Sequence, residues 1–215
     1  MREPSDRDRI ARPASVARQR WVVVGIMMLP VAVILLSSLL WWMVQRGQID
    51  LLGMLGTHNQ GTLLAPAKSI EELPLLDAKG EAFDYLAGER KWGLLIPGGA
   101  DCDEQCRQML WLTRQLHTAL GRRALYLRRY YLTSELPLAA EFAKYLAGEQ
   151  PGLTVLQVDA SALAKLAETA ATGGGEPAYY LVDKQGYIMM YYTAKHSGEQ
   201  VIDDIKFLMK QTGDD

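Results

Sequence analysis

The longest apolar run of the chain lies near its N-terminus. Residues 22–44 contain no charged side chain and consist mostly of Val, Ile, Leu and Met. The run exceeds the roughly 20 residues that an α-helix needs to cross a bilayer. Trp21 precedes it and Trp41 and Trp42 lie near its other end, the interfacial positions that tryptophan favours. We therefore predict one transmembrane helix over residues 21–45, and a buried soluble helix is the disfavoured alternative because it would rarely be apolar on every face.

The flanks of this run predict its orientation. Residues 1–20 carry six arginines against three acidic residues, and we expect them to form a disordered cytoplasmic tail. The run ends at tryptophan and arginine rather than at a small-residue cleavage site, so we expect an uncleaved anchor. The rest of the chain would then lie on the periplasmic side of a bacterial-type inner membrane. Residues 46–70, rich in glycine and without a sustained period, are interpreted as a linker or lead-in strand.

Residues 71–215 alternate between strand patterns and amphipathic helix patterns. The expected strands are 73–77, 91–97, 125–132, 153–158, 178–183 and 187–192, and the expected helices are 102–120, 137–146, 161–171 and 199–211. Such alternation indicates a mostly parallel sheet covered by helices on both faces. The last two strands flank Lys184-Gln185-Gly186, which predicts an antiparallel hairpin. We therefore predict an α/β domain with a central mixed sheet.

The two cysteines of the chain lie between an expected strand and an expected helix. Cys102 and Cys106 are four residues apart, so both can lie on one helix face about 6 Å from each other. The positive end of a helix lowers the pKa of a thiol, whereas Asp101, Asp103 and Glu104 oppose the thiolate. The pair could exchange disulfides, bind a soft metal, or form a permanent structural disulfide.

Two further residues are candidates for the same site. The element order resembles the thioredoxin-like fold, in which the strand after Pro177 runs antiparallel and begins at the cysteine end of the sheet. This resemblance makes Pro177 a candidate cis-proline beside the sulfurs, with the commoner trans state as the alternative. His196 follows the returning strand and is a candidate third metal ligand, with a solvated loop histidine as the alternative. His117 would lie about 16 Å along the helix axis from Cys106, too far to bind the same ion. His58 lies in the lead-in segment, and the sequence does not predict its position relative to the cysteines.

A Cys-x-x-x-Cys motif after a strand of a membrane-anchored domain, together with the run 179–187 (YYLVDKQGY), resembles the Sco/SenC family. That family comprises copper-delivery and thiol-redox proteins that assist the assembly of cytochrome c oxidase. The lead-in 57–64 (THNQGTLL) with Pro66 is similar to a segment of some Sco-like membrane proteins. The resemblance covers about residues 57–210, and it implies cytochrome c oxidase subunits or assembly factors as partners.

One departure from the family pattern concerns copper. The copper-binding histidine of the family precedes the penultimate strand, at about Gly175 of this chain, where Gly174, Glu176 and Pro177 supply no imidazole. Two thiolates alone can hold Cu(I), which is a soft ion. The departure shifts the expectation from copper delivery towards a thiol-disulfide reductant, or towards a copper site that His196 completes.

Three functions remain open from the sequence. The first is an oxidase-assembly factor in which Cys102 attacks as the thiolate and Cys106 resolves the mixed disulfide. The second is a non-catalytic, membrane-tethered binding module with a structural disulfide, and the third is a general periplasmic thiol-disulfide oxidoreductase. After residue 20 the chain carries 17 Lys and Arg against 22 Asp and Glu, and this acidic balance argues against a nucleic-acid-binding protein.

Overall fold

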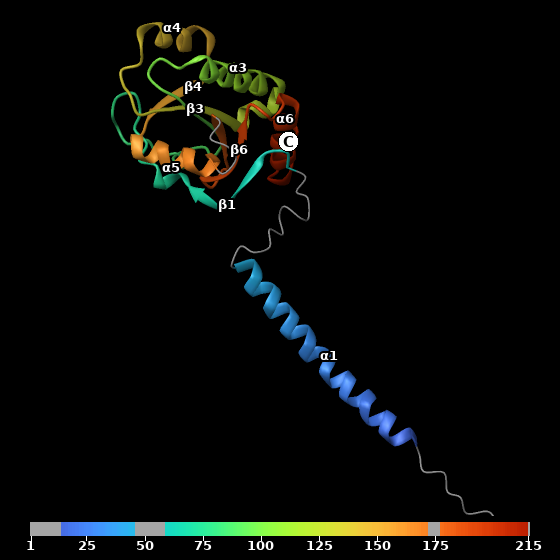
Figure 1. The fold of residues 1–215 in the computed structure, drawn as a ribbon. Coiled ribbons are helices and arrows are strands. Elements are labelled where there is room, and N and C mark those ends of the chain that lie inside the picture. Colours follow the sequence, from blue (N-terminus) through green and yellow to red (C-terminus); the bar gives the residue numbers. More distant parts are fainter. Residues whose placement is uncertain (1–13, 46–58, 172–176, 215) are drawn as a thin grey trace, which may run out of the picture. The chain divides into compact units, whose positions relative to one another are not determined.

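The computed structural model describes residues 14–45, 59–171 and 177–214. They belong to two separate units, an N-terminal helix and a compact domain that begins near residue 58 (Figure 1). The expected tail over residues 1–13 and the expected linker over residues 46–58, with His58, lie outside the described residues. The fold of each unit is therefore described by itself.

The N-terminal helix, α1, runs from Ala14 to Gln45. Its window Ile26–Met43 has a mean hydropathy of 2.2, and this helix is long and apolar enough to cross a membrane. The helix begins earlier than expected, since residues 14–20 are helical rather than part of a disordered tail. Ala, Arg and Gln, which make up most of that stretch, are good helix formers and extend the apolar helix by two turns.

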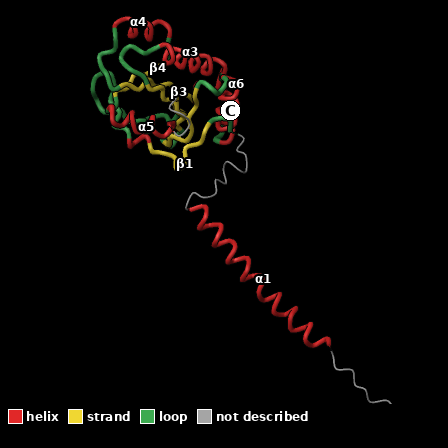
Figure 2. The backbone as a smooth tube through the Cα atoms, in the orientation of Figure 1, coloured by secondary structure: helices red, strands yellow, loops and turns green. Residues whose placement is uncertain are grey.

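The compact domain is built on one six-stranded mixed sheet, drawn in yellow in Figure 2. Its strands are β1 (Thr62–Ser69), β2 (Trp92–Pro97), β3 (Leu127–Thr133), β4 (Leu153–Gln157), β5 (Ala178–Val182) and β6 (Tyr187–Thr193). Their spatial order is β1-β6-β5-β2-β3-β4. The strands β2, β3 and β4 are parallel, whereas β5 pairs antiparallel with β2, β6 with β5, and β1 with β6. The predicted mixed sheet and its closing hairpin are confirmed.

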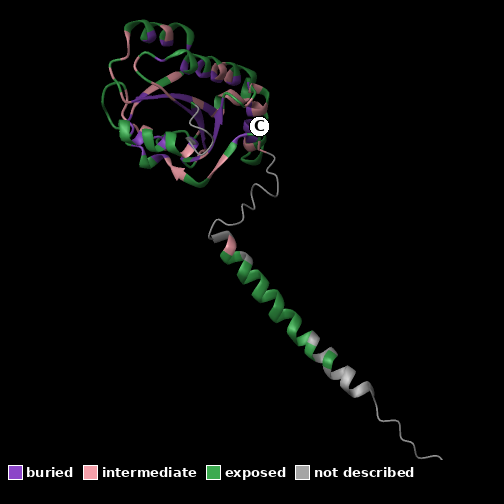
Figure 3. Ribbon diagram, in the orientation of Figure 1, coloured by how far each residue is buried: buried purple, intermediate pink, exposed green. Residues whose placement is uncertain are grey.

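Helices cover both faces of the sheet, so β2 is buried on both sides (Figure 3). The helices are α3 (Glu104–Ala119), α4 (Ala140–Glu149), α5 (Ala160–Ala171) and α6 (Gly198–Gln211). Residues of α3, α4 and α6 share one apolar core with Leu94 and Ile96 of β2. The alternate residue Leu95 faces the second core, which α5 and residues of the segment 70–85 cover. The sheet therefore holds two apolar layers, and the cysteines belong to the first.

Two short 3₁₀-helices lie between these elements, η1 (Ile70–Glu72) and η2 (Gly121–Tyr126). The predicted strand 73–77 is wrong, because within it only Leu76 makes isolated bridges, to Ala82 and Gln157. Pro74 lacks an amide hydrogen and cannot donate to a continuous ladder. The segment instead buries Leu73 and Leu75 against the second core.

The edge strand β1 forms within the segment 46–70, the expected linker or lead-in strand, and pairs with β6. Two helix starts also differ from the prediction. The helix expected from Cys102 begins at Glu104, because the side chain of Asp103 caps it by accepting the Cys106 N–H at 2.8 Å. The helix expected from Pro137 begins at Ala140. Cys102 therefore lies in the loop before α3 rather than on the helix.

Candidate redox site

The loop between β2 and α3 carries the first cysteine. It leaves the sheet at Pro97 and is held from the side, since the Ala139 N–H donates to the Ala100 carbonyl at 2.9 Å and the Ala100 N–H donates to Glu135 Oε2 at 3.2 Å. Cys102 has a φ of 48°, a left-handed backbone that residues other than glycine seldom adopt. A backbone N–H and a side chain from outside the loop, those of Ala139 and Glu135, therefore fix the path that delivers Cys102.

Cys102 and Cys106 form a disulfide across the start of α3, with their Cα atoms 5.4 Å apart. Cys106 lies in the first turn of the helix, whereas Cys102 precedes the capping residue Asp103. Arg107 Nε donates to the Cys102 carbonyl oxygen at 3.2 Å and so ties the loop to the helix. The cysteines are only 3% and 5% exposed, so their reactivity depends on the hollow beside them.

The side chain of Tyr131 lies beneath the disulfide. Its hydroxyl is 3.5 Å from Cys106 Sγ and donates to the Gly99 carbonyl oxygen at 2.6 Å. Burial raises the pKa of Tyr131 above its ordinary value, and the nearby carboxylates of Asp103 and Asp101 add to this effect, so the phenol stays protonated at neutral pH. A Cβ at Gly98 would overlap the Tyr131 hydroxyl, so any larger residue there would force the phenol to move.

The sequence analysis did not identify Tyr131 as part of the site. The available signal was its position near the end of a strand parallel to β2, since parallel strands bring their carboxyl ends to the same edge. In the structure Tyr131 pairs with Ile96, one residue before β2 ends. The parallel register thus places the phenol next to the loop that carries the cysteines.

Both cysteines line a hollow of about 780 Å³. Residues of α5 and of the start of β5 close its other side, and Pro177 lies in this lining together with the two cysteines. The peptide bond before Pro177 joins it to Glu176, outside the described residues, so its predicted cis state stays a prediction. The cis bonds of the described residues precede Pro66 and Pro137.

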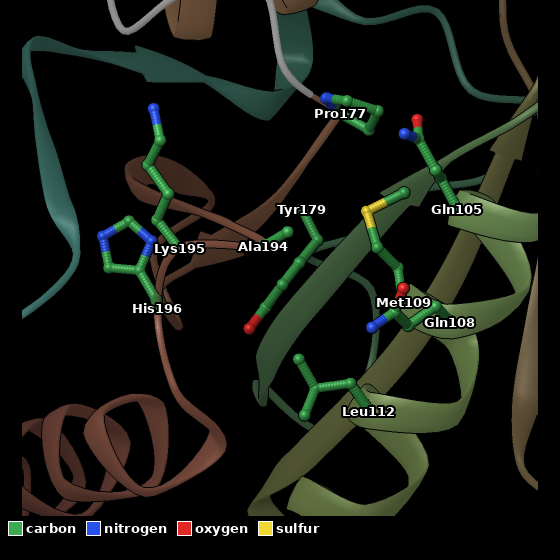
Figure 4. A pocket seen from close by; sticks show the side chains of 9 residues that line it. All are labelled: Gln105, Gln108, Met109, Leu112, Pro177, Tyr179, Ala194, Lys195 and His196. Atoms are coloured by element: carbon green, nitrogen blue, oxygen red, sulfur yellow. The ribbon is translucent and has the colours of Figure 1, made fainter.

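His196 occupies a different position from the cysteines. Its Nδ1 accepts the Thr193 N–H at 3.0 Å, and its ring lies edge-on to Tyr192. It lines a second hollow, next to Lys195 and Tyr179 (Figure 4). Within residues 14–45, 59–171 and 177–214, no three His, Cys, Asp or Glu residues are grouped closely enough to hold a metal ion. His196 as a third metal ligand therefore stays a prediction.

His117 lies on α3 near the start of β3, away from the cysteines. Its Nε2 is 3.3 Å from the Leu127 carbonyl oxygen. Burial lowers the pKa of this imidazole below its usual value, and the charge of Arg129 acts in the same direction. The neutral ring therefore serves the packing of α3 on β3.

Opposing charges surround the disulfide. The first turn of α3 directs its N–H groups towards the cysteine loop, which favours a thiolate after reduction. Asp101 and Asp103 line the same hollow and oppose a thiolate, although Asp103 is engaged as the helix cap. The guanidinium of Arg107 lies close to the Cys102 carbonyl and adds a positive charge. These local groups therefore act on the reduced pair in opposite directions.

A family model described as "Transmembrane-like, thioredoxin-like, C-terminal domain" matches residues 92–212, more than half of the chain. The chain belongs to this family. The matched region begins at β2, includes the cysteine loop and all of α6, and leaves out β1. No curated protein matches the chain closely enough to count as a relative.

Solved structures agree with membership of this transmembrane-like, thioredoxin-like family. The apo Sco1 protein from Thermus thermophilus superimposes with a TM-score of 0.54 at 18% identity, over 70% of this chain and 96% of that one. Yeast Sco1 with copper bound gives 0.51 at 17%, over 72% and 95%. Arabidopsis thaliana ScoI with copper bound gives 0.51 at 12%, over 70% and 98%. The thioredoxin-like fold and the predicted Sco resemblance are confirmed, and at these identities the likeness concerns the fold.

Proposed function

We propose that the protein is a membrane-anchored, Sco-like thiol-redox factor that acts through Cys102 and Cys106 in the assembly of cytochrome c oxidase. The observation that carries the proposal is the disulfide at the carboxyl end of β2, in the lining of a hollow of about 780 Å³.

The helix α1 would anchor the protein with its N-terminus in the cytoplasm and its domain in the periplasm. Protease added to spheroplasts would then digest the domain, and a protected domain would exclude this topology.

The reaction is an exchange between two dithiol-disulfide pairs. The Cys102 thiolate attacks one sulfur of the partner disulfide, which releases a partner thiolate and leaves a mixed disulfide. The Cys106 thiolate then attacks Cys102 Sγ, which forms the intramolecular disulfide and releases the second partner thiolate. The partner gains two electrons, and a separate dithiol donor must reduce the pair again. Two protons from solvent or from the protein's thiols complete the balance.

The geometry supports different roles for the two cysteines. Cys102 lies in the loop, outside the hydrogen-bonded helix, whereas the Sγ of Cys106 lies against the Tyr131 hydroxyl in the first turn of α3. A residue in the loop can form a bond to a partner without disturbing the helix. This arrangement favours Cys102 as the attacking residue and Cys106 as the resolving one.

The reduced pair also fits Cu(I) as a cargo. Two thiolates at this spacing are the soft ligands that Cu(I) prefers, and a disulfide offers neither. Reduction would thus be needed before Cys102 and Cys106 hold the ion, with His196 as the proposed third ligand. Titration of the reduced full-length protein with Cu(I) against a chelator should show one-to-one binding that Cys106→Ser abolishes. Unchanged binding by His196→Ala would remove that residue from the site.

Thiol exchange provides the test of the redox proposal. In detergent micelles, the reduced full-length protein should transfer electrons to a disulfide-bonded peptide of its oxidase partner. Cys102→Ser should abolish the exchange, and Cys106→Ser should stop it at the mixed disulfide. In cells, both variants should lower copper loading of the oxidase. Unchanged exchange and unchanged copper loading with Cys102→Ser would show that the proposal is wrong.

One observation favours a second function, a binding module with a permanent disulfide. Both cysteines are almost fully buried in the oxidised state, as structural disulfides commonly are. A reduction potential below about −300 mV would support this function, because such a bond resists cellular thiols. A higher potential would support exchange. Equal reduction of unrelated disulfide proteins would instead identify a general oxidoreductase.

A further inference from the structure

The hydroxyl of Tyr131 lies within reach of two acceptors, one of which is a reacting sulfur. Its oxygen is 2.6 Å from the Gly99 carbonyl oxygen, to which it donates, and 3.5 Å from Cys106 Sγ. A carbonyl oxygen is a good acceptor, whereas a neutral cysteine sulfur is a weak one. The hydroxyl hydrogen is therefore better placed on Gly99 as long as the disulfide is closed.

The ring of Tyr131 is held in place, whereas its hydroxyl hydrogen can turn. The side chain is fully buried, and its ring packs edge-on against Phe142 with the centroids 5.2 Å apart. Gly98 approaches so closely that an added Cβ would overlap the hydroxyl. A hydroxyl hydrogen rotates about its C–O bond to suit the acceptor. The phenol can therefore exchange the Gly99 oxygen for the Cys106 sulfur without any movement of the ring.

Opening of the disulfide turns Cys106 Sγ into a strong acceptor. The thiolate of a dithiol donor attacks Cys102 Sγ and forms a new S–S bond, while the bond between Cys102 and Cys106 breaks and its electron pair goes to Cys106 Sγ. The second thiolate of the donor then releases Cys102, and the donor becomes a disulfide. Hydrogen bonds to an ionised acceptor are about twice as strong as neutral ones. A donor beside Cys106 would thus favour its departure.

Other groups near Cys106 do not offer this stabilisation. The Cys106 N–H already donates to Asp103 Oδ1 at 2.8 Å. The carboxylates of Asp101 and Asp103 line the same hollow as the sulfurs and oppose a new negative charge. Burial raises the pKa of Tyr131, so its phenol keeps the proton at neutral pH. The phenol is therefore a neutral donor in a place where a departing thiolate meets negative charge.

We propose that Tyr131 is a catalytic residue of the exchange, which donates a hydrogen bond to Cys106 Sγ as this sulfur leaves Cys102. The proposal rests on the function proposed above, since it requires that the disulfide opens during turnover. The hydroxyl bonds to Gly99 in the closed state and to Cys106 in the open state. It keeps its proton in both, so it stabilises the leaving sulfur without becoming charged itself.

The rate at which a small dithiol opens the disulfide tests the proposal. Dithiothreitol is added to the oxidised full-length protein in micelles at pH 7, and free thiols are alkylated in timed samples and counted by mass spectrometry. Tyr131→Phe should slow the opening about tenfold, less than the loss of one donor to an oxyanion, because sulfur is the weaker acceptor. Opening at the wild-type rate would overturn the proposal.

Tyr85 provides a matched control on the other side of the sheet. It is also a buried tyrosine, its hydroxyl donates to the Lys91 carbonyl oxygen at 2.8 Å, and an added Cβ at Gly93 would overlap that hydroxyl. It belongs to the second core, whereas the cysteines belong to the first. Tyr85→Phe should therefore open at the wild-type rate. Equal slowing by Tyr85→Phe and Tyr131→Phe would assign the effect to lost stability and overturn the proposal.

A second reaction separates catalysis from the support of the loop. In a Cys106→Ser background Cys102 is the only thiol of the chain, and its attack on Ellman's reagent involves no departure of Cys106. Tyr131→Phe should leave the rate of this attack unchanged, although the hydrogen bond to Gly99 is lost. Slowing of this attack by the same factor as the opening would give Tyr131 a structural role and overturn the proposal.

The wild-type protein distinguishes this proposal from the redox function on which it rests. A wild-type disulfide that excess dithiothreitol leaves closed would exclude both. A wild-type disulfide that opens as fast as that of Tyr131→Phe would overturn the role of Tyr131 and leave the redox function standing.

Discussion

The Tyr131 hydroxyl and Gly98 show how closely single residues are fitted around the disulfide. An added Cβ at Gly98 would overlap that hydroxyl and two ring carbons of Tyr131. We predict that Gly98→Ala destabilises the protein by about 1–3 kcal/mol, the cost of overpacking. In a Tyr131→Phe background the cost should be smaller, because one of the overlapping atoms is gone. Urea denaturation followed by tryptophan fluorescence measures both values.

Gly148 provides the control for this prediction. It lies in α4, and an added Cβ there would meet no atom within 4 Å. Gly148→Ala should therefore leave stability unchanged or raise it by up to about 1 kcal/mol through helix propensity. Costs for Gly98→Ala that are identical with and without the Tyr131 hydroxyl would contradict the proposed contact.

At the scale of elements, a single carboxylate fastens the start of β1 to α6. Asp204 of α6 is buried and accepts the N–H groups of Gln60 and Gly61 at 2.7–3.0 Å and the Tyr192 hydroxyl at 3.3 Å. We predict that Asp204→Asn destabilises the domain by about 2 kcal/mol, because an amide nitrogen would face donors. Limited proteolysis should show faster cleavage near residue 60.

The adjacent Asp203 is an exposed residue of the same helix, so Asp203→Asn is the matched control and should behave like the wild type in both measurements. If Asp204→Asn matched it in stability and in cleavage rate, the carboxylate would not fasten β1.

At the scale of the whole domain, Asp214 ties the end of the chain to two distant elements. Its carboxylate accepts from Lys184 Nζ at 2.7 Å, from the Thr212 hydroxyl at 2.7 Å and from Trp92 Nε1 at 3.2 Å. Burial acts to raise the pKa of Asp214, but these hydrogen bonds outweigh it and hold the pKa below its usual value of 3.8. The carboxylate therefore stabilises the folded state above pH 3.8, and this stabilisation is lost as the pH falls through the lowered pKa.

Denaturation of Asp214→Asn across pH tests this link. At pH 7 the variant should be less stable than the wild type by about 1.5–3 kcal/mol, the range for hydrogen bonds to charged groups. The difference should shrink as the pH falls below 3.8, because the wild-type carboxylate becomes protonated. A difference that stays constant down to pH 2.5 would contradict the assignment to ionisation.

The strands and α-helices between residues 91 and 211 could be predicted to within three residues at each end because their apolar periodicity is regular. The 3₁₀-helix η2 could not, and it takes the first two residues of the expected strand 125–132. The strand 73–77 could not, since Leu73 and Leu75 pack against the second core and Leu76 alone pairs with the sheet, by an isolated bridge to Gln157 of β4. The start of α3 depended on which of several acidic residues caps the helix, and Asp103 does so. The sequence shows several acidic residues that could each cap the helix, and it does not show which of them does.

The sequence by itself determined that α1 is long and apolar enough to cross a membrane, the order of strands and helices, and the proximity of Cys102 and Cys106. Each depends on residues that are neighbours along the chain, through apolar run length, periodicity or four-residue spacing. Only the tertiary structure decided that the Tyr131 hydroxyl meets Cys106 and that the buried Tyr179 hydroxyl has no hydrogen-bond partner among the described residues. The physical reason is that strand register and helix packing, which join residues far apart in the chain, decide these contacts.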